Sequence, residues 1–368
     1  MDASTSPMSM EVKWDEDTLA HMVDLLKREI PPPNAMSQQV PSNVPLGSDA
    51  YWALESTRDL LKRNVAYARW QFLKTLETVE KSKGWNSKDG GITRAVIVFM
   101  PGDLGRQRSR EFRALFLSWI RMRQEQPKSI KTDLVVVTPE ENLKRLSNLG
   151  CVAAVRNGTE ENERCVISLY IPLLSRKVPE GVALDPLTEY KGYIDSMLCL
   201  AEYDGYQYDV VMRSDLDAFL MPGFATWIPP SRTTLVVGQG GYGHENAHAH
   251  LKYVNEVLGL DMKDGLVRLV GLGSTWFGDT GLMVASARLT IEVMRWMQTQ
   301  EFNTFEKCCS GTLGWPHWHW PVLLLYGGHV ALNHIGSSAT VVVSSDTNGR
   351  MDFPSTSNDN IDHSIKEC

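Results

Sequence analysis

YDVVMRSDLDAFL, at residues Tyr208–Leu220, is an apolar run that ends in two carboxylates one residue apart. Tyr208–Met212 has the usual length of a buried strand, and Asp215 and Asp217 come where that strand gives way to a loop. If the chain stays extended there, both side chains point to one face, roughly 7 Å apart at the backbone. Because two carboxylates repel each other, we expect a cation between them, and a hard divalent ion suits their oxygen ligands.

The chain around this stretch predicts an α/β fold with a mostly parallel, Rossmann-like sheet flanked by helices. Ala95–Met100 and Leu134–Val137 are continuous apolar runs, which are typical of strands buried on both faces. Ser109–Gln124 lies between them with helical spacing, so the three form a right-handed strand–helix–strand unit. Val166–Leu174 and Leu235–Val237 are predicted as further strands. In open sheets of this kind, ligands bind at the carboxyl ends of the strands.

The strand followed by Asp-x-Asp resembles the metal-binding signature of nucleotide-sugar glycosyltransferases with the GT-A fold. Tyr190–Leu200 looks like the helix that precedes this strand, and the residues from Pro222 to Pro229 resemble poorly characterised eukaryotic GT-A-like proteins. The resemblance implies an enzyme that moves a sugar from a UDP- or GDP-linked nucleoside diphosphate sugar to a hydroxyl of a glycan, protein or small-molecule acceptor. It also implies Mn²⁺ or Mg²⁺ as the cofactor, held by Asp215 and Asp217.

The same resemblance points to further residues around the aspartate pair. Many GT-A enzymes complete the metal site with a C-terminal histidine, and His334 resembles that ligand, with His329 as its competitor. Lys191 and Arg213 would add positive charge near the phosphates or the sugar. The nucleoside would lie against two strand ends, at Phe99, Met100, Pro101, Thr138 and Glu140.

Besides Asp217, the second candidate for a catalytic residue is Asp279. It lies in Gly271–Val284, which predicts a polar, glycine-rich loop that leads into a strand, followed by an amphipathic helix near Ala287–Gln298. In the GT-A fold, a comparable loop and strand carry an acid or amide that faces the acceptor, near an Asn-x-Gly-like turn. The Gly-Asp-Thr-Gly turn departs from that pattern. Asp279 is therefore a candidate for acceptor contact or general base, and a turn-capping aspartate is the alternative.

Three parts of the sequence are also compatible with functions other than glycosyl transfer. His244-Glu245-x-x-His248 is formally the H-E-x-x-H motif of zinc metallohydrolases, but a glycine-rich run directly before it opposes the helix that this motif needs. An aspartyl-phosphate phosphatase also has a strand with D-x-D, yet Phe219 stands where its signature has Thr or Val. A non-catalytic GT-A-like protein, with some of the eleven tryptophans as sugar-stacking faces, is a further alternative.

The composition sets limits on the domains and partners. With 368 residues, 43% of them hydrophobic and 22% charged, the chain is long enough for one large domain or two small ones. Helical spacing in residues 14–30 and 48–83 predicts an N-terminal helical arm and linker over 1–90, before a catalytic domain over 91–344. The polar tail at 345–368 is expected to be disordered. A net charge of −7 argues against nucleic acid as a partner, and no stretch is apolar for long enough to span a membrane.

The six cysteines leave the compartment open between the cytoplasm and the secretory pathway. They are too sparse for a disulfide scaffold, and free thiols in a reducing cytosol are one interpretation. The other is a disulfide between Cys151 and Cys165, which bracket a glycosylation sequon at Asn157–Thr159. That arrangement would suit a secretory enzyme whose membrane anchor is missing from this chain.

One group of arginines stands out because the chain as a whole is acidic. The residues are Arg106, Arg108, Arg110 and Arg113. The run is too short to follow a nucleic-acid backbone, and it is better placed to meet one anion than a polymer.

Overall fold

A computed structural model describes residues 49–82, 84–85, 91–102, 106–153, 164–180, 183–190, 193–203, 208–239, 245–261, 272–302, 307 and 318–343. The chain divides into two compact units, Met1–Asp59 and Leu60–Cys368, and the second contains the sheet. The predictions for residues 14–30, the sequon and the tail at 345–368 lie outside the described residues. No helix in the described ranges is long and apolar enough to cross a membrane.

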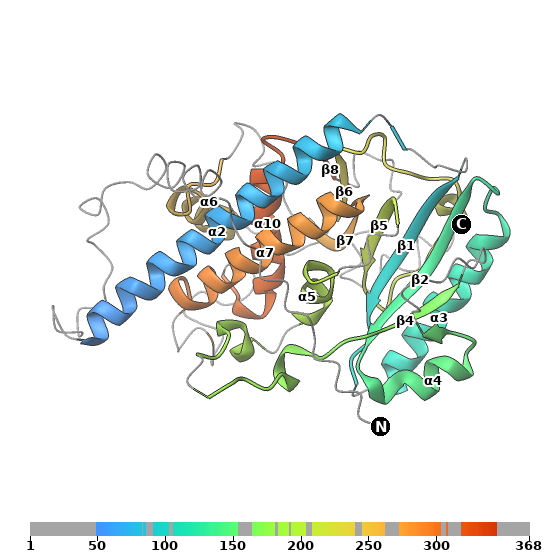
Figure 1. The fold of residues 1–368 in the computed structure, drawn as a ribbon, viewed down its shortest axis with the longest axis horizontal. Helices are drawn as coiled ribbons and strands as arrows, with labels where there is room; N and C mark the ends of the chain where they lie inside the picture. The colour runs from blue at the N-terminus through green and yellow to red at the C-terminus, as the bar shows by residue number, and fades with distance from the viewer. Residues whose placement is uncertain are drawn as a thin grey trace, which may run out of the picture. The chain divides into compact units, whose positions relative to one another are not determined.

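The larger unit is built on one mixed sheet, in the order β3-β4-β2-β1-β5-β7-β6-β8 (Figure 1). Strands β3, β4, β2, β1 and β5 run parallel to one another. Strand β7 runs antiparallel to both neighbours, and β6 and β8 are parallel. The strand bounds are β1 Ile92–Phe99, β2 Ile130–Thr138, β3 Val152–Ala153, β4 Cys165–Leu169, β5 Val210–Ser214, β6 Thr234–Gln239, β7 Leu272–Asp279 and β8 Thr340–Val343. The predicted fold class, a mostly parallel α/β sheet flanked by helices, is confirmed.

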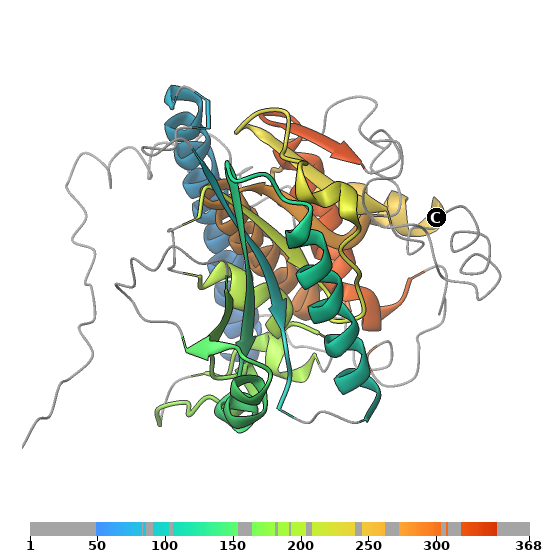
Figure 2. The ribbon, with the colours of Figure 1, turned by 90° about the vertical axis from the view of Figure 1, so that its right-hand side faces the viewer.

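Helices cover both faces of this sheet (Figures 1 and 2). One face carries α3 and α4, and the other carries α5, α6, α7, α10 and the part of α2 from Leu60 onward. The helix bounds are α2 Asp49–Lys81, α3 Arg106–Gln124, α4 Leu143–Asn148, α5 Asp195–Ala201, α6 Glu245–Val257, α7 Thr280–Gln300 and α10 Leu323–Ile335. Short 3-10 turns lie at η2 Glu140–Asn142, η3 Leu173–Ser175, η4 Pro186–Glu189, η5 Pro222–Ala225 and η7 Trp320–Val322.

Strand β1 shows why its sequence forms a central strand. Ile97 contributes to the core under α5, α7 and α10, whereas Val96 and Val98 contribute to the core under α3. All three side chains are almost fully buried, so both faces of the strand require apolar residues. The continuous apolar run at Ala95–Met100 follows from this position between two helical layers.

The segment from Gly271 to Val284 corrects one prediction. Leu272–Asp279 is strand β7 and α7 begins at Thr280, so the strand lies where a polar loop was expected. Gly278 has a packing role in β7, because a Cβ added there would come within 2.4 Å of a Leu235 side-chain atom on β6. The glycine that looked like a loop residue instead lets two strands and their side chains approach closely.

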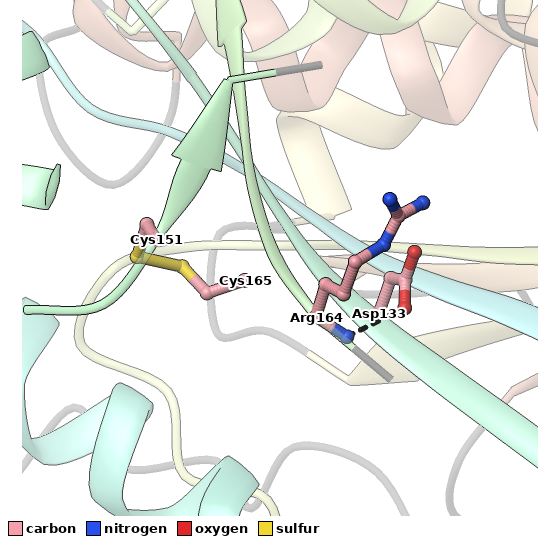
Figure 3. Close-up of a disulfide and its surroundings, with 4 residues drawn as sticks. All are labelled: Asp133, Cys151, Arg164 and Cys165. Atoms are coloured by element: carbon pink, nitrogen blue, oxygen red, sulfur yellow. Dashed lines mark hydrogen bonds between the residues drawn. A yellow bond between two sulfur atoms is a disulfide. The ribbon is translucent and has the colours of Figure 1, made fainter. Parts of the chain in front are cut away.

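A disulfide between Cys151 and Cys165 fastens the edge of the sheet (Figure 3). It joins the residue before β3 to the first residue of β4. Next to it, the Arg164 backbone N–H donates a 2.9 Å hydrogen bond to Asp133 of β2. Of the two interpretations of these cysteines, the structure agrees with the disulfide, whereas Cys199 is a free, buried thiol.

Candidate active site at the carboxyl edge of the sheet

The acidic loop after β5 lies at the carboxyl edge, where the parallel strands end. Leu216 and Leu220 are buried, whereas Asp217 between them is exposed. The Leu220 backbone N–H donates a 3.0 Å hydrogen bond to the Ser118 hydroxyl on α3. Two buried leucines and this bond fix the loop to the sheet and α3, so the Asp217 side chain is presented from a firmly held backbone.

Arg213 is buried beneath this loop and holds Asp215 in place. Its guanidinium donates to the Ser196 hydroxyl at 2.6 Å, to the Ser274 carbonyl on β7, and to Asp215 Oδ1 at 3.4 Å. The sequence predicts that Arg213 lies near the phosphates or the sugar. In the structure only 2% of the residue is exposed, so its side chain does not reach a ligand. Arg213 is instead a positioning residue that ties α5, β7 and Asp215 together, and Ser196 and Ser274 are partners that the sequence did not reveal.

The electrostatic environment of Asp217 favours a cation. Although Asp217 is an exposed residue, surrounding protein atoms remove part of the hydration of its carboxyl, which raises its pKa. The nearby carboxylates of Asp215 and Glu111 raise the pKa further. Glu111 lies on α3 and was not among the sequence candidates, because nothing in its local sequence marks it as a neighbour of β5.

The predicted nucleoside contacts divide into buried and accessible residues. Thr138 is buried and its hydroxyl donates to the Met100 carbonyl at 2.8 Å, while Asn142 donates to the Pro101 carbonyl at 2.9 Å. Met100 is also fully buried, so Met100 and Thr138 brace the ends of β1 and β2 and do not face a ligand. Pro101 remains partly accessible.

Two other predicted contacts lie at this same edge. Glu140, just after β2, is exposed. Phe99 at the end of β1 is mostly buried and packs edge-on against Tyr170, with ring centroids 5.8 Å apart. Of the five residues expected to hold a nucleoside, Pro101 and Glu140 therefore have the most accessible side chains.

Asp279 lies at the opposite edge of the sheet from the acidic loop. It pairs with Val210 at the start of β5, five residues before Asp215, which corresponds to roughly 17 Å along a strand. Its Oδ1 caps α7 by accepting from the Gly281 and Leu282 backbone N–H groups, and its Oδ2 accepts from Arg232 at 2.6 and 2.9 Å. The structure thus separates Asp279 from Asp217 and gives it the capping role that was the alternative.

His334 is also placed away from the acidic loop. Strand β8, which follows α10 by a few residues, pairs in parallel with β6 from Thr234 onward. This register places the end of α10 near the edge that carries Asp279. His334 is buried, its Nδ1 accepts a 3.0 Å hydrogen bond from the Asp261 backbone N–H, and burial lowers its pKa to about 4. It is therefore a neutral core histidine and not a third ligand beside Asp217.

His329 faces α6 and not the aspartates. Its ring stacks on that of His248, with centroids 5.4 Å apart and planes 14° apart. Burial, with a smaller contribution from His248, lowers the pKa of His329 to about 3. The H-E-x-x-H motif begins at the very start of α6, with Glu245 as the first helical residue, and His244 and Lys191 lie outside the described residues.

The donor set at the acidic loop fits a metal ion that keeps positions for substrate. Among the described residues, no group of three or more His, Cys, Asp or Glu side chains is arranged to hold a metal ion. Asp215 and Asp217 nevertheless offer carboxylate oxygens, and Mg²⁺ in proteins is commonly held by one or two carboxylates together with substrate phosphates and water. The aspartate pair fits such a site without a histidine.

Comparisons with known proteins give weak structural likenesses and one family match. The WbbM bifunctional glycosyltransferase has a TM-score of 0.32 and 15% identity, over 61% of this chain and 38% of WbbM, so the chain spans well under half of that protein. Mouse xyloside xylosyltransferase 1 has a TM-score of 0.37 and 10% identity, over 68% of this chain and 85% of its own. A search of curated proteins gave no match. Residues 88–366 match the model of a domain of unknown function, DUF7164, and because this covers most of the chain, the chain belongs to that family.

Proposed function

We propose that this chain is a metal-dependent glycosyltransferase, which moves a sugar from a UDP- or GDP-linked nucleoside diphosphate sugar to a hydroxyl acceptor. The observation that carries the proposal is the carboxylate of Asp217, presented at the edge of the sheet where the parallel strands have their carboxyl ends. Asp215 and Glu111 lie close enough to raise its pKa. A rigid loop that gathers negative charge at a ligand-binding edge is suited to a divalent cation with an anionic substrate.

Asp215 and Asp217 would hold Mn²⁺ or Mg²⁺, with phosphate oxygens of the donor and water as the other ligands. When bound, the ion supplies Lewis-acid stabilisation of the negative charge that develops on the diphosphate leaving group. Arg213 keeps Asp215 oriented through its bonds to Ser196 and the Ser274 carbonyl. This bracing sets the geometry of the aspartate pair before substrate arrives.

Arg108 is the residue that we assign to the diphosphate from the protein side. It lies three residues before Glu111, so the two side chains share a face of α3. Its guanidinium donates to the Tyr193 hydroxyl at 3.3 Å and lies 5.4 Å from the centre of that ring. An arginine held by an aromatic ring beside a cluster of carboxylates can donate to phosphate oxygens while its stem stays ordered.

The test is binding of UDP or GDP in the presence of Mn²⁺, measured by calorimetry. We expect Asp217→Asn to weaken Mn²⁺-dependent nucleotide binding at least 10-fold, because one of two charged ligands is lost, and to abolish transfer from the nucleotide sugar. Glu125→Gln is the matched control, since Glu125 is an exposed acid just beyond the other end of α3. It should leave binding within twofold of the wild type.

Two results would contradict the proposal. One is nucleotide binding by wild-type protein that is equally tight in chelator and in Mn²⁺. The other is sugar transfer by the Asp217→Asn variant at the wild-type rate. A thermal shift with Zn²⁺ alone, without nucleotide, would favour the H-E-x-x-H alternative instead.

A further inference from the structure

A cavity of about 180 Å³ lies between α3 and α4, on the face of the sheet that these two helices cover. It is lined by Ser109, Phe112, Arg113, Arg145, Asn148 and Leu149. Two arginines, both exposed residues, therefore border one small space, together with Ser109 and Asn148. Phe112 and Leu149 give the space an apolar wall.

Neither arginine has its charge neutralised by a carboxylate of the described residues. Within the described part of the chain, Arg113 and Arg145 have no ion pair or side-chain hydrogen bond. Other arginines of the same unit, such as Arg176, Arg232 and Arg295, each pair with a carboxylate at 2.6 to 2.7 Å. Two positively charged arginine side chains that border the same cavity repel each other. An anion bound between them would offset this repulsion.

The sequence around the cavity strengthens its positive character. Helix α4, Leu143–Asn148, contains Lys144 and Arg145 and no acidic residue, although the whole chain has a net charge of −7. Helix α3 has no acidic residue in its first turn, where negative charge would favour the helix dipole. The charge of Arg113 is therefore not balanced by an acidic residue in the first turn of α3 or by one in α4.

The cavity is separate from the acidic loop. Glu111, whose carboxylate acts on Asp217, and Arg113 are two residues apart on α3, a rotation of about 200° around the helix axis. Arg113 consequently points to the side of α3 away from Asp217. An anion held by Arg113 and Arg145 would not be the diphosphate at the proposed active site.

Size and charge select the class of ligand. The cavity could hold roughly six water molecules, which suits a single phosphate group and not a whole nucleotide sugar. Two arginines match the charge of a phosphate monoester, between −1.5 and −2 at pH 7. Guanidinium groups also fit phosphate oxygens with paired hydrogen bonds. We infer that the cavity between α3 and α4 binds a phosphate group, either free phosphate or the phosphate monoester of a sugar.

Calorimetry on the full chain tests this inference, with inorganic phosphate, glucose 6-phosphate and glucose as probes. We expect both phosphates to bind at pH 7 and glucose not to bind. Arg113→Gln with Arg145→Gln should weaken phosphate binding at least 10-fold. The matched control is Arg110→Gln with Lys144→Gln, which removes the same charge from the same helices at exposed residues that do not line the cavity, and should change binding less than threefold.

Binding at pH 5 should be several-fold weaker than at pH 7, because the phosphate monoester takes up its second proton near pH 6. Tighter binding of glucose 6-phosphate than of inorganic phosphate would assign the cavity to a sugar phosphate, and equal binding would assign it to the free ion. Equal losses in the two double variants, or no binding of either phosphate to the wild type, would overturn the inference.

The Asp217→Asn variant separates this site from the proposed active site. It should bind phosphate as the wild type does, whereas the variant with Arg113 and Arg145 replaced should keep its Mn²⁺-dependent nucleotide binding. Loss of phosphate binding in Asp217→Asn would place the anion at the acidic loop and so contradict a second site.

Discussion

The pH dependence of the melting temperature tests whether the carboxyl of Asp217 lies among other carboxylates. Its pKa in the folded chain is raised above the ordinary value of 3.8 by partial loss of hydration of the carboxyl and by the charges of Asp215 and Glu111. A carboxyl whose pKa is raised by folding stabilises the folded state at pH values below its pKa in the unfolded chain. This contribution is lost as the pH rises through its pKa in the folded chain. Without metal, we expect Asp217→Asn to melt about 1 °C above the wild type at pH 7 and equally with it below pH 3.8.

Mn²⁺ should reverse this order at pH 7, because only the wild type gains the ion by linkage. Melting curves at several pH values, each with and without Mn²⁺, give the measurement. A wild type that is more stable than Asp217→Asn at pH 7 without metal would show that Asp217 has an attractive partner and does not sit among repelling carboxylates.

At single residues, the sequence predicts a position in the fold correctly where that position follows directly from a strand. Asp215 and Asp217 could be predicted because the apolar run of β5 fixes where the carboxyl edge begins. His334 could not, because the register of β8 against β6 decides at which edge α10 ends. Glu111 could not be predicted either, because only the packing of α3 on the loop after β5 brings its side chain near Asp217.

At the scale of elements, the cap of α7 is the clearest case for a stability measurement. Asp279 is buried, accepts from two backbone N–H groups and pairs with Arg232. We expect Asp279→Ala to destabilise the fold by about 3 kcal/mol, since it removes the cap and leaves Arg232 without its carboxylate. Asp279→Asn keeps a capping oxygen and should lose less than half of that.

Chemical denaturation of both variants gives these free energies. Mn²⁺-dependent nucleotide binding serves as the control, and it should stay unchanged while the variants are folded, because Asp279 lies at the other edge of the sheet. If Asp279→Asn kept its stability and lost sugar transfer, the catalytic role expected from the sequence would return.

The elements also show what limits prediction from a sequence. Strands β1, β2 and β5 were predictable because burial on both faces leaves a continuous apolar run. Strand β7 is equally buried, but Gly273, Ser274 and Gly278 interrupt its pattern. Those residues suit their partners, because Gly278 makes room for Leu235 and the Ser274 carbonyl accepts from Arg213. Such reasons exist only once the neighbouring strands are in place.

At the scale of the whole molecule, the disulfide links the redox state of the surroundings to the stability of the larger unit. Cys151 and Cys165 are 14 residues apart and close a loop at the β3–β4 edge of the sheet. Closing a loop of this length restricts the unfolded chain and contributes about 3 kcal/mol. That is a large part of the 5–15 kcal/mol that typically separates folded from unfolded domains.

We therefore expect reduction to lower the melting temperature of the wild type by roughly 6–12 °C, at about 2–4 °C for each kcal/mol. Cys151→Ala with Cys165→Ala should melt near the reduced wild type and be insensitive to reductant, while Cys199→Ala should keep the full response to reductant because its thiol is free.

Cys151 lies two residues after Leu149, which lines the cavity between α3 and α4. Reduction of the disulfide should therefore weaken phosphate binding more than Mn²⁺-dependent nucleotide binding. Equal melting of oxidised and reduced protein, or two titratable thiols at Cys151 and Cys165 in non-reducing buffer, would contradict a structural disulfide.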